Sequence, residues 1–351
     1  MNMDVIVLKG SRAAIGHEHG RRYAKQIVAS LEVYDRLFRD FAELDWRQAR
    51  LQAKRFLPAI ERHFPGILDE LGGLAQGAGI DFDDILTLNC RSEISLTRAS
   101  GGCSAFSLNR RGQQWLAQNW DWRQDQLHNV AVLRIELDNG TTLISVGEAG
   151  MVAKIGLNAH GIGVCLNAIR SRTCGDGLPI HFALRKMLES PDFATAKRVT
   201  THDRVASPAH FLLASAEGQV EGLEVHPGAP GELSSQNGIV THTNHLYTQA
   251  ATTCVEDFPR PDSATRLSRL DQLLARQIDE TPQALFELLS DHDNAPTSIC
   301  RHTNHAQPEA ERMETLFSVV MNLSRREFHF RLGKPCDPID SLTLGLANEV
   351  A

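Results

Sequence analysis

The chain has no apolar run that approaches the roughly 18 residues a membrane-spanning helix needs. Residues 1–9 hold only a short apolar stretch, with no basic segment and no long hydrophobic segment, so they do not resemble a secretory signal peptide. We therefore expect a soluble, cytoplasmic protein that has no membrane partner.

The chain also has no excess of positive charge. Its 36 lysines and arginines are outnumbered by 43 aspartates and glutamates, the formal net charge is −7, and the basic residues are scattered rather than clustered. Such a balance provides no electrostatic surface for a nucleic acid or an anionic membrane. We expect neither as a partner.

Closely spaced cysteine pairs are missing as well. The seven cysteines are odd in number, lie far apart in the sequence and form no CxxC motif. This usage favours a reducing compartment over a disulfide framework, and the spacing provides no thiolate cage for zinc. We therefore expect mostly buried structural thiols, no metal and no cofactor. The cysteines are Cys90, Cys103, Cys165, Cys174, Cys254, Cys300 and Cys336.

A length of 351 residues, with 42% hydrophobic and 23% charged residues, is sufficient to bury a substantial core. We find no internal repeat, low-complexity tract or linker that would divide the chain. A single domain over residues 1–351 is therefore the expected organisation.

The first third of the chain is predicted to be mostly helical. After a short strand at 5–8, apolar residues recur at helical spacing over 12–41, and helical patterns follow at 67–78 and 82–94. Several glycines are frequent for a helical region and predict close packing or a break. They are Gly72, Gly73, Gly77 and Gly79.

From Cys103 onward the hydrophobic period changes to two, which indicates strands. Predicted strands form an antiparallel meander at 115–120, 130–137, 142–146, 152–157 and 162–169. Two predicted helices follow at 180–188 and 193–201, then three strands at 209–215, 220–226 and 239–243, and then two helices at 263–277 and 282–291. Two closing strands, at 316–323 and 327–332, flank a tight hairpin turn. These blocks predict an α+β fold in which two antiparallel sheets pack face to face with helices outside.

Cys103 follows Gly101 and Gly102 at the point where the helical pattern ends. Its thiol would belong to a new N-terminus if the chain cleaved itself after Gly102. Glycine adopts backbone conformations closed to other residues, which would let the peptide sit strained against the sulfur. The freed α-amine, whose ordinary pKa is about 7.7–8.0, could then take the thiol proton. The alternative is a loop before a strand.

Asp121 lies between Trp120 and Trp122 at the end of the next predicted strand, after Asn119. A hairpin would place this strand beside the one that begins at Cys103. A carboxylate among large apolar groups needs a partner, such as a protonated amine. The alternative is an aspartate that caps a turn.

An HTNH motif occurs at 242–245 and again at 302–305. Asn244 follows a predicted strand, where its amide would be a good oxyanion donor. Arg301, before the second motif, would lower a thiol pKa or bind a carboxylate in a cleft, and is otherwise a surface arginine. The histidines of the two motifs also raise the weaker hypothesis of a zinc site. They are His242, His245, His302 and His305.

Taken in order, these motifs resemble a known family. The segment 102–106 (GCSAF), NWDW at 119–122, TNH at 243–245 and CRH at 300–302 are similar to the acyl-coenzyme A:6-aminopenicillanic acid acyltransferase family of N-terminal nucleophile hydrolases. The resemblance covers nearly the whole chain. Further similar segments lie at 10–20, 64–79, 88–93 and 333–336.

The resemblance implies a four-layer αββα sandwich and a zymogen that cleaves itself between Gly102 and Cys103. The products, residues 1–102 and 103–351, would stay together as a heterodimer. Cys103 would be the nucleophile and its freed amine the base.

The resemblance also implies roles for other residues. Asp121 would orient the amine, Asn244 would hold the oxyanion, and Arg301 would lie near the thiol. Arg91 and Glu93 are expected to form a buried ion pair that braces the helices. We expect substrate contacts from Phe106, Trp122 and His245.

The implied reaction attacks a linear amide C–N bond of a small molecule, or an acyl-thioester, through an acyl-enzyme on Cys103. Water or an amine can release the acyl group, and we favour water. Two alternatives stay open: a non-catalytic ligand-binding member of the same fold, and a zinc-dependent hydrolase that uses the HTNH histidines.

Overall fold

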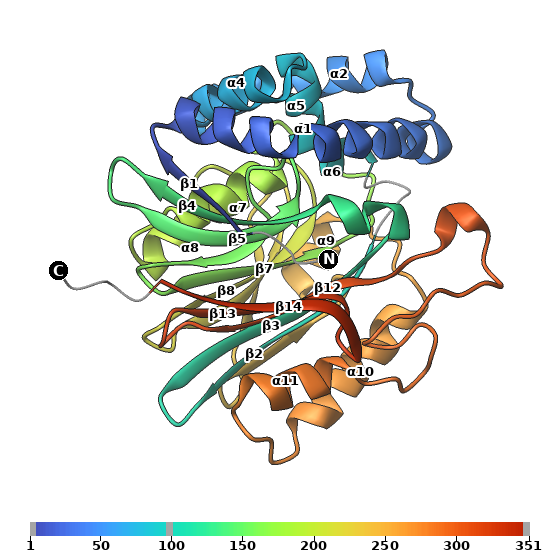
Figure 1. The fold of residues 1–351 in the computed structure, drawn as a ribbon. Coiled ribbons are helices and arrows are strands. Elements are labelled where there is room, and N and C mark those ends of the chain that lie inside the picture. The colour runs from blue at the N-terminus through green and yellow to red at the C-terminus, as the bar shows by residue number, and fades with distance from the viewer. Residues whose placement is uncertain (1–4, 96–100, 347–351) are drawn as a thin grey trace.

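The computed structural model of the chain describes residues 5–95 and 101–346. Its helices and strands form four layers, with two β-sheets stacked between an upper and a lower helical layer (Figure 1). The helices are α1 (Arg12–Leu37), α2 (Trp46–Lys54), α3 (Leu57–His63), α4 (Ile67–Ala78), α5 (Phe82–Asn89), α6 (Arg91–Ser95), α7 (Ile180–Leu188), α8 (Phe193–Thr201), α9 (Gln249–Cys254), α10 (Asp262–Leu274) and α11 (Pro282–Leu289).

The larger sheet has the order β1-β4-β5-β6-β7-β8-β9-β10. Apart from β1, which pairs with β4 in parallel, its neighbours are antiparallel and consecutive along the chain. The strands are β1 (Val5–Gly10), β4 (Val130–Leu137), β5 (Thr142–Glu148), β6 (Ile155–Asn158), β7 (Ile162–Ala168), β8 (Ala209–Ser215), β9 (Val220–Val225) and β10 (Gly231–Ser234).

The smaller sheet is antiparallel and has the order β11-β2-β3-β12-β13-β14. Its hairpin β2–β3 turns through Arg111 and Gly112, both with positive φ, which matches the strand twist that two-residue hairpins require. The strands are β2 (Gly102–Arg110), β3 (Gln113–Trp122), β11 (Ile239–His242), β12 (Glu314–Asn322), β13 (Glu327–Lys334) and β14 (Asp337–Gly345).

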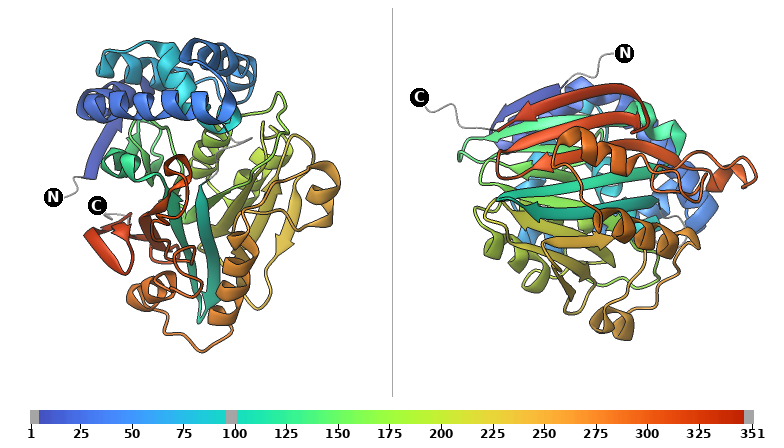
Figure 2. Two further views of the ribbon diagram at one scale, coloured as in Figure 1. Left: turned by 90° about the vertical axis from the view of Figure 1, so that its right-hand side faces the viewer. Right: turned by 90° about the horizontal axis from the view of Figure 1, so that it is seen from below.

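Helices cover the outer face of each sheet. The N-terminal helices, with α7 and α8, lie over the larger sheet, whereas α10 and α11 lie under the smaller one (Figure 2). In the described ranges, no helix has the length and apolar character that a membrane span requires.

The glycines of the helical region allow two helix backbones to touch. A Cβ on Gly73 would lie 2.2 Å from the carbonyl oxygen of Ala13, and one on Gly77 would lie 2.0 Å from that of His17. On the other helix, Gly16 and Gly20 approach α4 equally closely. The predicted close packing at Gly73 and Gly77 is confirmed, because any larger residue would force α1 and α4 apart.

Successive side chains of a strand point to opposite faces, so the two faces of β2 contribute to two different apolar clusters. On β2, Cys103 and Ala105 face the main core, which includes residues of both sheets. Phe106 and Leu108 point to the opposite face, where they pack in a second cluster with residues of α10 and α11. The side of the strand on which a residue lies therefore decides whether it can reach Cys103.

Several sequence predictions are confirmed. The four-layer α+β architecture is present, 130–137 is a strand, and the closing hairpin turns between Asn322 and Glu327. Other predictions were wrong in detail. The predicted meander at 115–169 splits between the two sheets, the helix at 82–94 breaks at Cys90, β1 is parallel to its neighbour, and β14 was not predicted.

Candidate active site

Cys103 lies near the start of β2, directly opposite Trp120 of β3. Its side chain is buried, with 1% of its surface exposed. Its backbone N–H donates a 2.8 Å hydrogen bond to Oδ1 of Asn244. The structure thus brings together two of the residues that the sequence motifs indicated.

Gly101 and Gly102 are glycines because their surroundings leave no room for a side chain. A Cβ on Gly101 would lie 2.6 Å from the carbonyl oxygen of Asp121, and one on Gly102 would lie 2.4 Å from Oδ2 of the same residue. Neither glycine has a left-handed φ. The expectation that this pair is needed for unusual backbone angles was therefore wrong, and close approach to Asp121 is the reason for both glycines.

Asp121 does not lie between the two indoles, because successive side chains of a strand point to opposite faces. Trp120 and Trp122 share the inner face of β3, where their rings stack with centroids 6.2 Å apart. On the other face, Oδ2 of Asp121 accepts a 3.0 Å bond from Nε of Arg301, and Oδ1 accepts a 2.7 Å bond from Thr315. In this structure the cationic partner of Asp121 is thus a guanidinium.

Arg266 of α10 links these groups, although no sequence motif indicated it. Its Nη1 donates to the carbonyl oxygen of Cys103 at 2.6 Å, and its Nη2 donates to Oδ1 of Asn244 at 2.9 Å. Its Nε bonds Asp262, which also accepts a hydrogen bond from Arg301. Burial disfavours the negative charge of Asp262 and raises its pKa, but Arg266 and Arg301 outweigh this effect and lower the pKa of Asp262 to about 2.

The side chain of Asn244 is fixed from both ends. Its Nδ2 donates one hydrogen bond to the carbonyl oxygen of Ala168 at 2.8 Å, which leaves its second amide hydrogen for another acceptor. Its backbone N–H donates to Ser263 Oγ at 2.8 Å. The orientation of the Asn244 amide is therefore set before any ligand arrives.

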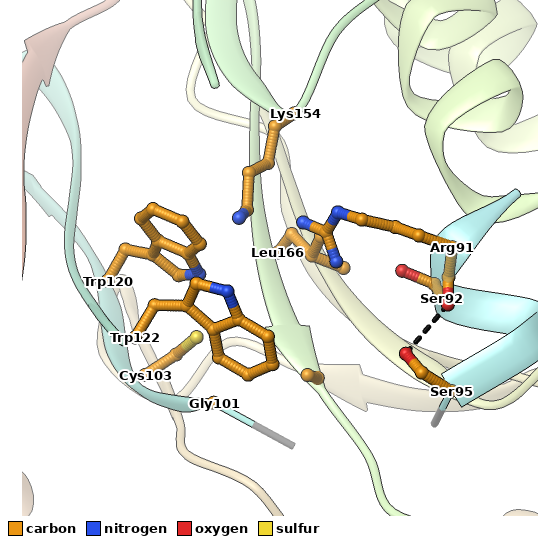
Figure 3. A pocket seen from close by; sticks show the side chains of 10 residues that line it. Arg91, Ser92, Ser95, Gly101, Cys103, Trp120, Trp122, Lys154 and Leu166 are labelled. Atoms are coloured by element: carbon orange, nitrogen blue, oxygen red, sulfur yellow. Dashed lines mark hydrogen bonds between the residues drawn. The ribbon is translucent and has the colours of Figure 1, made fainter. Parts of the chain in front are cut away.

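A cavity opens on the thiol side of Cys103, between α6 and the inner faces of both sheets (Figure 3). The volume open to the centre of a water-sized molecule is about 30 Å³. Its walls combine aromatic, aliphatic, hydroxyl and cationic groups, which suits a small molecule with an apolar part and a polar part. The lining residues are Arg91, Ser92, Ser95, Gly101, Cys103, Trp120, Trp122, Lys154, Leu166 and Ala168.

The cations of the cavity share a single buried carboxylate, that of Glu148. It lies 2.6 Å from Nη2 of Arg91 and 3.4 Å from Nζ of Lys154, and it also accepts a hydrogen bond from Tyr34. Lys154 Nζ lies 3.2 Å from the ring centroid of Trp120. Burial lowers the pKa of Lys154 to about 7, an effect that Arg91 increases and Glu148 opposes.

The electrostatic surroundings of the Cys103 thiol are mixed. Burial raises the pKa of the thiol, and the charge of Asp121 raises it further, whereas Lys154 and Arg266 act in the opposite direction. In the continuous chain the thiol is therefore protonated at neutral pH, and a base is needed to activate it.

The structure does not bring every predicted residue to this cavity. Phe106 is fully buried on the opposite face of β2, among residues of α10 and α11. His245 bonds Ser263 and is not among the cavity residues, whereas Trp122 is. Arg91 pairs with Glu148, and Glu93 instead accepts hydrogen bonds from Ile180 N and Ser207 Oγ.

The histidines of the two HTNH motifs do not converge on one ion. His242 bonds Glu224, with Nε2 and Oε1 3.0 Å apart. Among the described residues, two groups of side chains come close enough to share a metal, and neither includes His242, His245 or His305. The hypothesis of a zinc-dependent hydrolase built on these motifs was therefore wrong.

The sequence analysis did not identify Lys154 or Arg266 as site residues, and only one of the two has a signal in the sequence. Lys154 is a lone lysine within an otherwise apolar predicted strand, and a buried charge of this kind points to a functional site. Arg266 occupies an ordinary polar position of a predicted helix, so only the folded structure shows what it contacts.

Comparison with known proteins agrees with this fold and shows the family. The sequence profile of the acyl-coenzyme A:6-aminopenicillanic acid acyl-transferase family matches residues 108–337. The 40 kDa form of acyl-coenzyme A:6-aminopenicillanic-acid-acyltransferase from Emericella nidulans is 28% identical over 348 residues, which cover 98% of this chain and 96% of that protein.

Solved structures resemble the fold at low sequence identity. Two variants of the conjugated bile acid hydrolase from Clostridium perfringens align with a TM-score of 0.50 and 11% identity each; they cover 69% and 70% of this chain and 92% of their own. The fold is that of the N-terminal nucleophile hydrolases. Within this class, the chain belongs to the acyl-coenzyme A:6-aminopenicillanic acid acyl-transferase family.

Proposed function

We propose that the chain is a self-processing cysteine amidohydrolase or acyltransferase in which Cys103, once freed from Gly102, is the nucleophile. The observation that carries this proposal is the position of Cys103. Its thiol opens into the cavity, its backbone nitrogen bonds Asn244, and the carboxylate of Asp121 lies against Gly102.

Processing would begin when the Cys103 sulfur attacks the carbonyl carbon of Gly102. The Gly102–Cys103 amide bond breaks as the thioester forms, and the proton of the thiol passes to the Cys103 nitrogen. Water then opens the thioester, which leaves a carboxylate on Gly102 and returns the thiol to Cys103. The new amino group arises where the backbone nitrogen already bonds Asn244. Loss of Gly102 would open the space beside Asp121 to that amino group.

In the mature enzyme, the free amine of Cys103 would act as the base. It would take the thiol proton while the sulfur attacks the carbonyl carbon of the substrate, and it would return that proton to the leaving amine. The remaining amide hydrogen of Asn244 Nδ2 is the donor that we assign to the oxyanion. Arg301 would act through Asp121 as a positioning residue, because its guanidinium bonds that carboxylate.

The two fragments, residues 1–102 and 103–351, would remain one catalytic domain after cleavage. Helices of the first fragment contribute to the same apolar core as the strands of the second. The cavity is also lined from both sides of the junction, by α6 on one side and by β3 and β7 on the other. Separation of the fragments would therefore destroy the site.

The cavity favours a substrate that has both an apolar surface and an anionic group. Trp120, Trp122 and Leu166 provide the apolar wall. Two cations share one carboxylate there, and Nε of Arg91 has no acceptor among the described residues, so a bound carboxylate would balance the charge. We therefore propose N-acyl amino acids or related linear amides as substrates, with water as the preferred acceptor.

The test is the covalent state of the purified protein. We expect two bands on a denaturing gel, a fragment whose N-terminal sequencing begins at Cys103, and an acyl adduct on that fragment when it is trapped with a reactive acyl donor. A chain that stays intact while turning over substrate would contradict the mechanism. An intact chain that neither turns over substrate nor accepts an acyl group would instead support the non-catalytic alternative.

The pH dependence of specificity tests the role of Lys154. Because burial lowers the pKa of Lys154 to about 7, its ammonium group is charged below that pH and loses its charge as the pH rises through that value. We expect the ratio of kcat/KM for an N-acyl amino acid to that for its neutral carboxamide to fall by about 10-fold across this range, since one charged hydrogen bond is lost. The ratio cancels the titration of the Cys103 thiol, which affects both substrates.

A matched pair of variants provides the control for Lys154. Lys154→Met should show a low ratio that does not change with pH, whereas Lys154→Arg should keep the ratio high above pH 7 because its guanidinium stays charged. If the ratio in Lys154→Met falls with pH just as it does in the wild type, this side chain does not recognise the substrate.

A further inference from the structure

A second group of reactive side chains lies outside the cavity, in the loop between α11 and β12 and at the tip of the β13–β14 hairpin. It consists of His292, Cys300, His302 and Cys336. Each offers one ligand atom, and no two of these atoms are more than 4.8 Å apart. The first three belong to one loop, and Cys336 reaches them from the neighbouring hairpin.

The spacing of these atoms fits a tetrahedral ion. With Zn–S bonds of about 2.3 Å and Zn–N bonds of about 2.0–2.1 Å, the ligand atoms of a tetrahedral site lie about 3.3–3.8 Å from one another. Here Sγ of Cys300 and Sγ of Cys336 are 3.5 Å apart, and Nε2 of His302 lies 3.8 Å and 3.6 Å from them. Nε2 of His292 lies 3.1 Å from Nε2 of His302.

From this geometry we propose that His292, Cys300, His302 and Cys336 bind one zinc ion. Paired thiolates and imidazoles in a tetrahedral arrangement are the donors that zinc prefers in proteins, and four protein ligands leave no open position for catalysis. The site is therefore structural. The sequence analysis considered only local spacing, whereas the fold brings Cys336 to the loop from a distant segment.

The surrounding loop is held in place by its own contacts. The backbone N–H of Cys300 donates to the carbonyl oxygen of Asp291 at 3.0 Å, and that of His302 donates to Pro296 at 2.9 Å. Arg269 of α10 pairs with the Asp291 carboxylate at 2.6 Å. The ligands of this loop are thus arranged by contacts that do not involve the ion, which reduces the entropy lost when it binds.

The position of the site gives it a consequence for the rest of the molecule. Cys300 and His302 directly flank Arg301 in the sequence. The guanidinium of Arg301 bonds Asp121 on β3, the strand next to the one that carries Cys103. An ion bound by both neighbours would fix the backbone on each side of Arg301. Zinc would therefore stabilise this segment and bind it to the β13–β14 hairpin, in cleaved and uncleaved protein alike.

The experiment measures zinc in untagged, full-length protein purified under reducing conditions after growth with added zinc. We expect about one zinc per chain in the wild type, a loss of about 10-fold or more in Cys336→Ser and in His292→Ala, and no loss in Cys254→Ser. Both substituted ligands are solvent-exposed, so these variants should fold; Cys254 is an exposed free thiol outside the group and serves as the control.

Two further readouts distinguish a bound zinc ion from a cluster of free thiols and imidazoles. Zinc added to chelator-treated wild type should raise its Tm, because the ion binds only the folded chain, and this shift should vanish in Cys336→Ser. Cobalt in place of zinc should give the absorption of tetrahedral thiolate coordination. Three results would each overturn the proposal: no zinc in the wild type after incubation with excess metal, as much zinc in both ligand variants as in the wild type, or a Cys300–Cys336 disulfide under reducing conditions.

Discussion

Substitution of Cys103 by alanine is expected to leave the chain uncut and to lower turnover on the order of 10⁴-fold or more, as removal of a catalytic nucleophile does. The same sulfur would carry out both cleavage and turnover, so one change should abolish both. The variant should fold normally, since alanine fits the buried position and the hydrogen bond from its backbone N–H to Asn244 does not need the thiol. Gel analysis and steady-state kinetics measure the two losses.

Cys165→Ala is the matched control for this experiment. Cys165 is a buried free thiol on β7, in the same apolar core as Cys103, but it is not among the residues that line the cavity. This variant should be cleaved and active. Cleavage at the Gly102–Cys103 junction in Cys103→Ala would show that another group opens that bond, and the assigned role of the sulfur would then be wrong.

The fold could be predicted where its signal is local. Alternating apolar residues predicted β4 at its observed bounds, and the short turn before Glu327 predicted the hairpin of β12 and β13. Pairing between distant segments has no such signal, which is why the parallel contact of β1 with β4 was missed. β14 was missed because it lies at the sheet edge, with alternate residues exposed and a proline near its start.

The candidate site, too, could be predicted only in part from local sequence patterns. The motif residues Cys103, Asp121, Asn244 and Arg301 lie close together. The expected hairpin predicted this for Cys103 and Asp121, whereas for Asn244 and Arg301 only the family resemblance implied it. The alternation of a strand also explains a failure, since Phe106 is three residues from Cys103 and must face the other way. Residues whose proximity depends on helix packing, such as Arg266, could not be inferred from spacing.

Loss of the Arg301 guanidinium is the second large effect that we expect. In wild type it bonds both Asp121 and Asp262, and all three side chains are buried. Arg301→Met would leave Asp121 with Thr315 as its hydrogen-bond donor. Asp262 would keep its ion pairs with Arg266 and Arg260. Removal of one partner from a buried ion pair costs about 3–5 kcal/mol, so we expect a loss of that size in the free energy of unfolding at pH 7.

The measurement is urea unfolding in the Cys103→Ala background, where the uncut chain avoids dissociation of fragments. Arg39→Met, which removes an exposed pair with Asp35, should cost no more than about 1 kcal/mol. Because Arg301 helps to lower the pKa of Asp262 to about 2, the stability from that pair is present above about pH 4 and is lost as the pH falls toward 2. The difference between Arg301→Met and its parent should therefore narrow over this range. A difference that stays constant with pH would mean that Arg301 stabilises the site through packing of its side chain rather than through its charge.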